Sequence, residues 1–358
     1  MDVSKLDARE LVELCEGADC WHTRAVPRLG LHPLMMDDGP HGLRKQEHTG
    51  DMLGMNRSLP ATCFPTAVLT ACGWDEELLF EIGAALGREA LAEGVGLILG
   101  PGANLKRSPL CGRNFEYFSE DPLLTGKLAA AFIRGVQSEG AGACLKHFAC
   151  NSQEYKRFSS DSVVDNRTLR ELYLRGFEIA VREGRPAVMC AYNAVNGVHC
   201  SDNKALLTDI LRSDWGFDGA VITDWGAMND RVRGFEAGCD LMMPGGSLYM
   251  ELECLAALRL GLLRREAVEK CAARVARLAE KYSAPAAEGR TADLDANHDL
   301  ARRAAASCAV LLKNEGGVLP IRDRAGTVFI GDMAVHPRYQ GSGSSHINAR
   351  KLTSAAGA

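Results

Sequence analysis

The feature that most limits the fold is a repeated pattern, in which a short apolar run ends in polar residues or a glycine turn and an amphipathic helix follows. The run 219–226, Gly-Ala-Val-Ile-Thr-Asp-Trp-Gly, shows it clearly, because β-branched residues between two glycines predict a strand buried on both faces. Asp224 follows this strand directly. In a parallel α/β barrel, side chains at the carboxyl ends of strands face the substrate-binding mouth. Asp224 is therefore a candidate functional residue, although an Asp at this position could equally cap the next helix.

Seven segments are strand candidates, and helical patterns separate most of them. They are 34–38, 61–70, 95–99, 142–145, 186–192, 219–223 and 240–246. The second is a poor regular strand but a plausible edge strand or loop, because Pro65 lies inside it. Strands that alternate with helices predict a parallel sheet, and this many units favour a closed barrel over an open sheet. The prediction for residues 1–282 is an α/β fold, a TIM-like (β/α)8 barrel with one strand missing or degenerate.

A second, shorter unit is predicted after the barrel. Residues 283–297 are rich in Ala, Pro, Glu, Gly and Arg, which is typical of a linker. Beyond them, 298–307 has a helical pattern, and 309–313 and 327–331 have strand patterns. Residues 298–358 are too few for a complete doubly wound domain. We therefore expect the start of an α/β sandwich domain that is cut short.

Composition excludes several classes of partner. A formal net charge of -5 on 358 residues, without a run of Lys and Arg, argues against nucleic acid and against anionic membranes. Thirteen scattered cysteines without a Cys-x-x-Cys pair argue against a disulfide framework and predict a reducing, cytoplasmic location. Asp37, Asp38 and His41 are close in sequence, but further ligands of metal-site spacing are absent. No metal or cofactor is expected.

Polar residues follow nearly every predicted strand. In chain order they are Asp38, Arg113, Lys146, His147, Tyr192 and Asp224. Each has an ordinary alternative: the Lys-His pair could lie on a solvated loop, the Arg could brace Glu116, and the Tyr could belong to the core. Together at one barrel mouth they suit a neutral, hydroxyl-rich ligand, and Trp225 offers a sugar ring an apolar face. A carboxylate that attacks an anomeric carbon is the first half of retaining glycoside hydrolysis.

Several motifs in order resemble those of glycoside hydrolase family 3 β-glucosidases. They are Asp38-Gly-Pro-His-Gly-Leu-Arg44, Gly112-Arg-Asn-Phe-Glu-Tyr-Phe-Ser-Glu-Asp-Pro122, Lys146-His-Phe148 with Asn151-x-Gln-Glu154, Ile222-Thr-Asp-Trp-Gly226, and Val310-Leu-Leu-Lys-Asn314 with Leu319-Pro320. The resemblance implies that Asp224 is the nucleophile of a retaining exo-β-glucosidase. It also implies that Asp38, Arg113, Lys146, His147 and Tyr192 bind the sugar in the -1 subsite. Arg157 is expected nearby.

The resemblance also implies the substrate and the missing part. The Asp38-Gly-Pro turn favours glucosides, so β-glucosides or cello-oligosaccharides are the expected ligands, and a homo-oligomer remains open. In two-domain members the acid/base glutamate lies in the second domain, beyond the Gly-Ser-Gly-Ser-Ser turn at 341–345. We therefore expect a fragment of a longer enzyme.

Three other functions stay open. They are a sugar-binding or regulatory remnant, a family 3 enzyme of other specificity, such as a xylosidase or N-acetylglucosaminidase, and a barrel enzyme that uses Lys146 as a Schiff-base amine.

Overall fold

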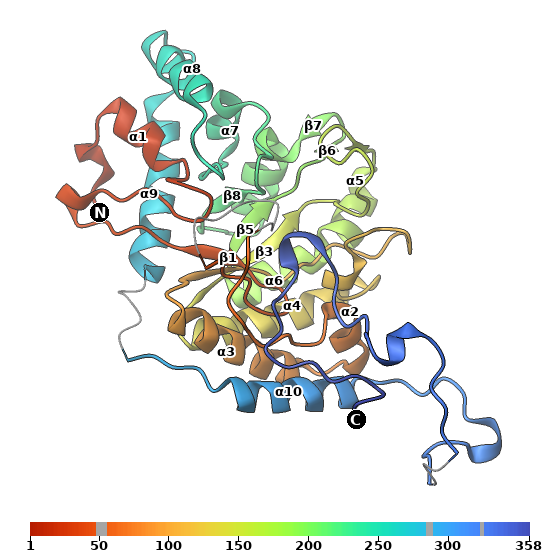
Figure 1. Cartoon of the computed structure of the whole chain (residues 1–358). Coiled ribbons are helices and arrows are strands. Elements are labelled where there is room, and N and C mark those ends of the chain that lie inside the picture. Colours follow the sequence, from red (N-terminus) through yellow and green to blue (C-terminus); the bar gives the residue numbers. More distant parts are fainter. Residues whose placement is uncertain (48–55, 284–288, 323–325) are drawn as a thin grey trace.

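The computed structural model describes residues 1–47, 56–283, 289–322 and 326–358, and its centre is a parallel β-barrel (Figure 1). Five strands form a sheet in the order β1-β2-β3-β5-β8. Their bounds are Met36–Asp38, Leu97–Leu99, Gly142–Phe148, Ala187–Cys190 and Val221–Thr223. Every pairing between neighbours is parallel. The predicted alternation of strands and helices is therefore confirmed.

Three short segments close this sheet into a ring. After β8, Leu241 bridges Ile222 in parallel, and Met242 bridges Glu16 in parallel. The chain then reverses, because Gly17 pairs antiparallel with Thr23, and His22 pairs antiparallel with Met35 next to β1. Hydrogen bonds from Met242 N to Cys15 O (2.9 Å) and from Met36 N to Trp21 O (2.9 Å) complete the circuit.

The described residues thus form a TIM-like barrel of eight segments, the five strands of the sheet together with 15–17, 21–23 and 240–243. One of them, 21–23, runs against the other seven. The sequence predicted one missing or degenerate strand, but two barrel segments were missed, 15–17 and 21–23. The strand candidate 61–70 is wrong: it contains an irregular stretch and the short helix α2 (Ala67–Thr70), because Pro65 cannot donate to a strand ladder.

Helices cover the outside of the ring. Those between the strands are α3 (Glu76–Ala92), α4 (Pro122–Ser138), α6 (Arg175–Gly184) and η7 (Ala205–Asp214). The remaining helices of the barrel are α1 (Ala8–Leu14), α7 (Arg231–Ala237), α8 (Leu248–Arg259) and α9 (Arg265–Tyr282). Alternate residues of a strand belong to two different apolar clusters. In β2, Ile98 lies in the cluster that includes α3 and α4, whereas Leu97 and Leu99 lie in the cluster that includes α1, α8 and α9. Among the described residues, no helix has the length and apolar character to cross a membrane.

After α9, helix α10 lies along the barrel, whereas the described part of the chain that follows α10 first loops away from it and contains no sheet (Figure 1). Helix α10 (Leu294–Ser307) is joined to α3 by a 2.7 Å hydrogen bond from Asn297 to Glu89. The strands predicted over 309–313 and 327–331 are absent from the described residues, and Leu312 and Ile330 are each 92% exposed. The prediction failed because a strand needs a hydrogen-bonded neighbour, and no described segment pairs with either run.

The C-terminal segment then returns to the barrel, and Figure 1 shows it in dark blue. Ala349 bridges Ala61, and Ile347 is fully buried. Gln340 holds both the N–H and the C=O of Ile347, at 2.8 and 2.9 Å. Residues 340–350 therefore pack against the barrel, although they follow the predicted linker in sequence. The domain boundaries at 282 and 298 stay predictions.

Candidate active site

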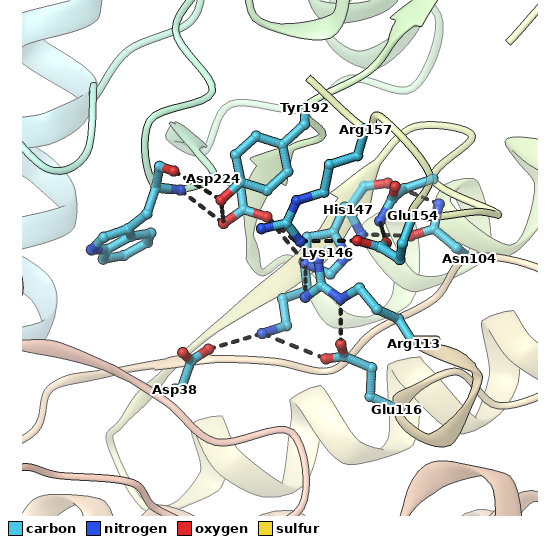
Figure 2. A network of polar contacts seen from close by, with 12 residues as sticks. Asp38, Asn104, Arg113, Glu116, Lys146, His147, Glu154, Arg157, Tyr192 and Asp224 are labelled. Atoms are coloured by element: carbon cyan, nitrogen blue, oxygen red, sulfur yellow. Dashed lines mark hydrogen bonds and ion pairs between the residues drawn. The ribbon is translucent and has the colours of Figure 1, made fainter. Parts of the chain in front are cut away.

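The carboxyl ends of four strands bring the predicted site residues together (Figure 2). Asp38 is the last residue of β1, and Lys146 and His147 belong to β3. Tyr192 lies two residues beyond β5, and Asp224 directly follows β8. All five are at least nine-tenths buried. The alternative in which the Lys-His pair lies on a solvated loop is wrong, because both residues belong to β3 and are buried.

Asp224 has one oxygen that is fixed and one that is free. Its Oδ1 accepts hydrogen bonds from Trp225 N (2.8 Å) and from the Tyr192 hydroxyl (3.1 Å). Its Oδ2 has no hydrogen-bond donor among the described residues, and the nearest cation, Arg113 Nη1, lies 3.6 Å away. Burial raises the pKa of Asp224, and the positive charges of Arg113 and Lys146 oppose that rise. The carboxyl group is thus held in one orientation, and its Oδ2 is buried without a hydrogen-bond donor among the described residues.

Two cations and two further carboxylates form the floor of the site (Figure 2). Arg113 Nε donates to Glu116 Oε1 at 2.6 Å, and Lys146 Nζ lies 3.0 Å from Asp38 Oδ1 and 3.7 Å from Glu116 Oε2. Burial alone would lower the pKa of Lys146, but Asp38 and Glu116 raise it above its ordinary value. Burial would raise the pKa of Glu116, but Arg113 and Lys146 hold it below its ordinary value. Lys146 is therefore an ammonium group, which argues against its use as a Schiff-base amine.

His147 is a neutral imidazole in this environment. Burial, followed by the charges of Arg113 and Lys146, holds its pKa well below the usual range. Arg113 Nη2 lies 2.7 Å from His147 Nε2, and a guanidinium can only donate, so Nε2 accepts. The proton then resides on Nδ1, which donates to the Tyr117 hydroxyl at 3.0 Å. Asn104 fixes the backbone of His147 on both sides, at 2.9 Å each.

Arg157, which the resemblance implied nearby, lies beside Tyr192 and Asp224 (Figure 2), and Trp225, which was predicted to offer an apolar face, directly follows Asp224. The Arg157 guanidinium is 4.3 Å from the centroid of the Tyr192 ring, and its Nη1 donates to Glu154 at 2.9 Å. Trp225 is half-buried, donates from Nε1 to Cys20 O at 2.7 Å, and packs against Trp21 with 5.4 Å between centroids and 41° between the ring planes. Both side chains are therefore fixed by contacts of their own.

A cavity of about 360 Å³ opens above these residues. Its wall consists of Arg113, Glu116, Glu154, Arg157, Tyr192 and Asp224 from the barrel together with 342–345 from the C-terminal segment. This volume lies in the range of small-molecule sites, about 300–1,000 Å³. A larger cavity of about 700 Å³ beside Trp74 and Lys106 contains none of the predicted site residues. We place the site at the smaller cavity, because the fixed carboxylates and cations converge there.

Sequence reasoning missed the supporting residues Asn104 and Tyr117 and the wall segment 342–345. Asn104 and Tyr117 reach His147 across 43 and 30 positions, so no local pattern marks them. Within the described residues, no group of three or more His, Cys, Asp or Glu side chains is arranged to hold a metal ion.

Comparison with known proteins links the chain to one family. The model for "Glycosyl hydrolase family 3 N terminal domain" matches residues 43–278. "Thermostable beta-glucosidase B" of Acetivibrio thermocellus is 51% identical over 98% of this chain and 46% of that protein. "Exo-alpha-(1->6)-L-arabinopyranosidase" of Bifidobacterium longum is 42% identical over 98% of this chain and 48% of that protein. The chain spans about half the length of the curated relatives it matches.

Solved structures show the same likeness. The GH3 beta-glucosidase of Bifidobacterium adolescentis superimposes with a TM-score of 0.91 at 42% identity, covering 99% of this chain and 50% of that one. Beta-glucosidase 3B of Thermotoga neapolitana, in complex with alpha-D-glucose, superimposes with a TM-score of 0.90 at 37% identity, covering 98% and 52%.

Proposed function

The chain belongs to glycosyl hydrolase family 3, and from this premise we propose that it carries the sugar-binding site and the nucleophile of a retaining exo-β-glucosidase. The substrate is a β-glucoside or a cello-oligosaccharide with a terminal, non-reducing glucosyl residue. A relative with 51% identity that is named as a beta-glucosidase supports this choice. So do the similar solved structures of beta-glucosidases in complex with glucose.

The observation that carries the proposal is the state of Asp224. Two donors fix Oδ1, whereas Oδ2 is buried without a donor among the described residues, and Asp224 lines the cavity. In the proposed reaction Oδ2 attacks the anomeric carbon as the bond to the aglycone oxygen breaks. The electron pair of that bond moves to the aglycone oxygen, which needs a proton unless it is a good leaving group. Water then hydrolyses the glycosyl ester.

The other charged groups bind and orient the sugar. Arg113, Lys146 and Asp38 are fixed in one network by Glu116, so they offer hydrogen bonds to hydroxyl groups without a large cost of ordering. His147 is neutral, and its Nε2 is occupied by Arg113. We therefore assign it a positioning role.

The acid/base carboxyl is not assigned to a described residue. Glu116 and Glu154 line the cavity with Asp224. Glu116 is held as a carboxylate by two cations, and Glu154 accepts from Arg157 (2.9 Å) and from Asn151 (3.1 Å). A group that must donate a proton is poorly served by such partners. Because the relatives are about twice as long, we place the acid/base glutamate in sequence outside these 358 residues.

The test is intact mass after incubation with an activated 2-deoxy-2-fluoro-β-glucoside, whose good leaving group removes the need for an acid. We expect one glucosyl adduct on the wild type and none on Asp224→Ala. Asp218→Ala is the matched control, because Asp218 is exposed and lies before β8 rather than after it. No adduct on folded wild-type protein would overturn the nucleophile assignment and favour the sugar-binding remnant.

A second specificity has support from one observation. The relatives from Bifidobacterium longum and Bifidobacterium breve, each 42% identical, are named as exo-α-(1→6)-L-arabinopyranosidases. Such a sugar lacks the hydroxymethyl group of glucose and differs from it at carbon 4. Faster labelling by an activated 2-fluoro analogue of arabinopyranose than by the glucoside would favour this candidate.

We also propose that the protein works in a reducing compartment such as the cytoplasm. All thirteen cysteines are free thiols, and burial is the main cause that raises the pKa of nine of them. Fractionation of the producing cell tests this location.

A further inference from the structure

Phe158 is an exposed aromatic residue that packs against Tyr192, a residue of the cavity wall. Its ring centroid lies 4.5 Å from that of Tyr192, with the planes at 60°. Tyr192 lines the cavity and donates to Asp224, whereas Phe158 is 58% exposed. From the carboxylate outward, the order is therefore Asp224, Tyr192, Phe158 and solvent.

The loop that carries Phe158 is held in place on both sides. Strand β4 (Asp161–Ser162) pairs with β6 (Ala194–Val195), and Ala194 N donates to Ser160 O at 2.9 Å. Arg157, the preceding residue, is held by Glu154 and lies 5.4 Å from the centroid of the Phe158 ring. Figure 2 shows Arg157 beside Tyr192 and Asp224. The exposed ring is thus ordered before any ligand binds, and a ligand has little ordering cost to meet there.

We propose that Phe158 forms an acceptor subsite for a leaving group with a flat apolar face, either an aryl group or the CH face of a second sugar ring. The inference rests on the proposed function, because the subsite is defined by what leaves from Asp224. When a glycosyl unit fills the cavity, its leaving group must extend toward solvent, and the Tyr192–Phe158 wall leads in that direction. An aromatic face binds such groups through contact area and ring geometry, with no hydrogen bond required.

Two covalent probes with the same sugar test the subsite. Both 2,4-dinitrophenyl 2-deoxy-2-fluoro-β-glucoside and 2-deoxy-2-fluoro-β-glucosyl fluoride leave the same adduct on Asp224, but only the first has an aryl leaving group. We expect Phe158→Ala to lower the ratio of the labelling efficiency of the dinitrophenyl probe to that of the fluoride probe by about fivefold, which is the scale of one aromatic contact. Phe158→Trp should keep the ratio. Tyr249→Ala, which removes an exposed aromatic on α8, is the matched control and should also keep it.

The ratio separates the possible failures. Labelling of the wild type by neither probe would refute the proposed function and the subsite with it. Labelling by both with an unchanged ratio in Phe158→Ala would refute the subsite alone, even if loss of the contact with Tyr192 slowed both reactions equally.

Competition then identifies the class of leaving group. Phenyl 1-thio-β-glucoside, thiocellobiose and methyl 1-thio-β-glucoside compete with labelling by the fluoride probe, and the methyl compound has no ring to place on Phe158. Weaker inhibition of Phe158→Ala by the phenyl compound assigns an aryl group, and weaker inhibition by thiocellobiose assigns a sugar ring. Equal inhibition of wild type and variant by all three compounds would contradict the subsite.

Discussion

Asp240 offers a sharp test of how the barrel is held together, because its carboxylate joins three elements. It is fully buried in the segment 240–243. Its Oδ2 accepts from Val221 N of β8 and from Arg212 of η7, both at 2.7 Å, and its Oδ1 accepts from Arg274 of α9 at 3.0 Å. Asp240→Asn keeps one acceptor oxygen and replaces the other with an amide that can only donate. At least one of these donors then loses its acceptor and faces another donor.

The expected loss is large and can be compared with an exposed pair. Breaking a buried ion pair by removing one partner costs about 3–5 kcal/mol. Because the Arg274 side chain is 18% exposed and water can reach it, we expect the lower end, about 3 kcal/mol. Asp214→Asn removes the same charge from a pair with Arg170 of similar length, 2.9 Å, whose side chains are 44% and 49% exposed. There we expect about 0–1 kcal/mol.

Urea unfolding of the three proteins at one pH measures both losses, provided that the dependence of the free energy on urea is the same. A loss for Asp240→Asn no larger than that for Asp214→Asn would show that the three hydrogen bonds do not hold the ring, and would refute the reasoning. A loss confined to a changed urea dependence would show an altered unfolded state instead.

Three further predictions concern Asp37, Tyr192 and the C-terminal segment at Gly341. Burial, and then the neighbouring carboxylate of Asp38, raises the pKa of Asp37 to about 8. The contribution of Asp37 to folding stability is therefore fully present below about pH 4 and is lost as the pH rises through about 8. In urea unfolding, Asp37→Asn should therefore lose less stability than the wild type between these limits, and equal losses would contradict the assignment. Tyr192→Phe removes a donor from Asp224, so the acidic limb of the labelling rate should move to higher pH, and an unmoved limb would contradict that bond. A Cβ on Gly341 would lie 2.5 Å from the Phe115 ring, so we expect Gly341→Ala to displace residues 340–350 and to speed their proteolysis. Adding Phe115→Ala should restore resistance to proteolysis, and a double variant that is still cleaved rapidly would contradict the clash with this ring.

Sequence periodicity predicted most of the barrel and the core of its site. The runs at 95–99, 142–145, 186–192 and 219–223 all contain strands of the sheet, since each is an apolar run long enough to be read alone. The positions of Lys146 and Asp224 at the strand ends followed from the same pattern, because parallel strands end at one edge. Their roles in the reaction stay predictions.

The rest depends on pairing that no local pattern reveals. The closing segments 15–17 and 21–23 are only three residues each and contain Glu16, His22 and Thr23, so their composition does not indicate strands. Ala61 and residues 348–350 are hydrogen-bonded although most of the chain separates them. The sequence on either side of Ala61 does not indicate which segment pairs with it. The runs 309–313 and 327–331 have strand composition but no partner among the described residues, and composition alone could not show this.

The long-range closures also set an order of events during synthesis. Domains fold from the N-terminus as the chain leaves the ribosome. One edge of the segment 15–17 stays unpaired until Met242 has been synthesised, because its partner on that edge is Met242. About two thirds of the chain must therefore emerge before the ring can close. The wall at 342–345 emerges roughly a hundred residues later. A nascent barrel therefore passes through a stage in which its charged floor is assembled but the C-terminal part of the cavity wall is absent, and a chain stalled between these points would expose the cavity on that side to solvent.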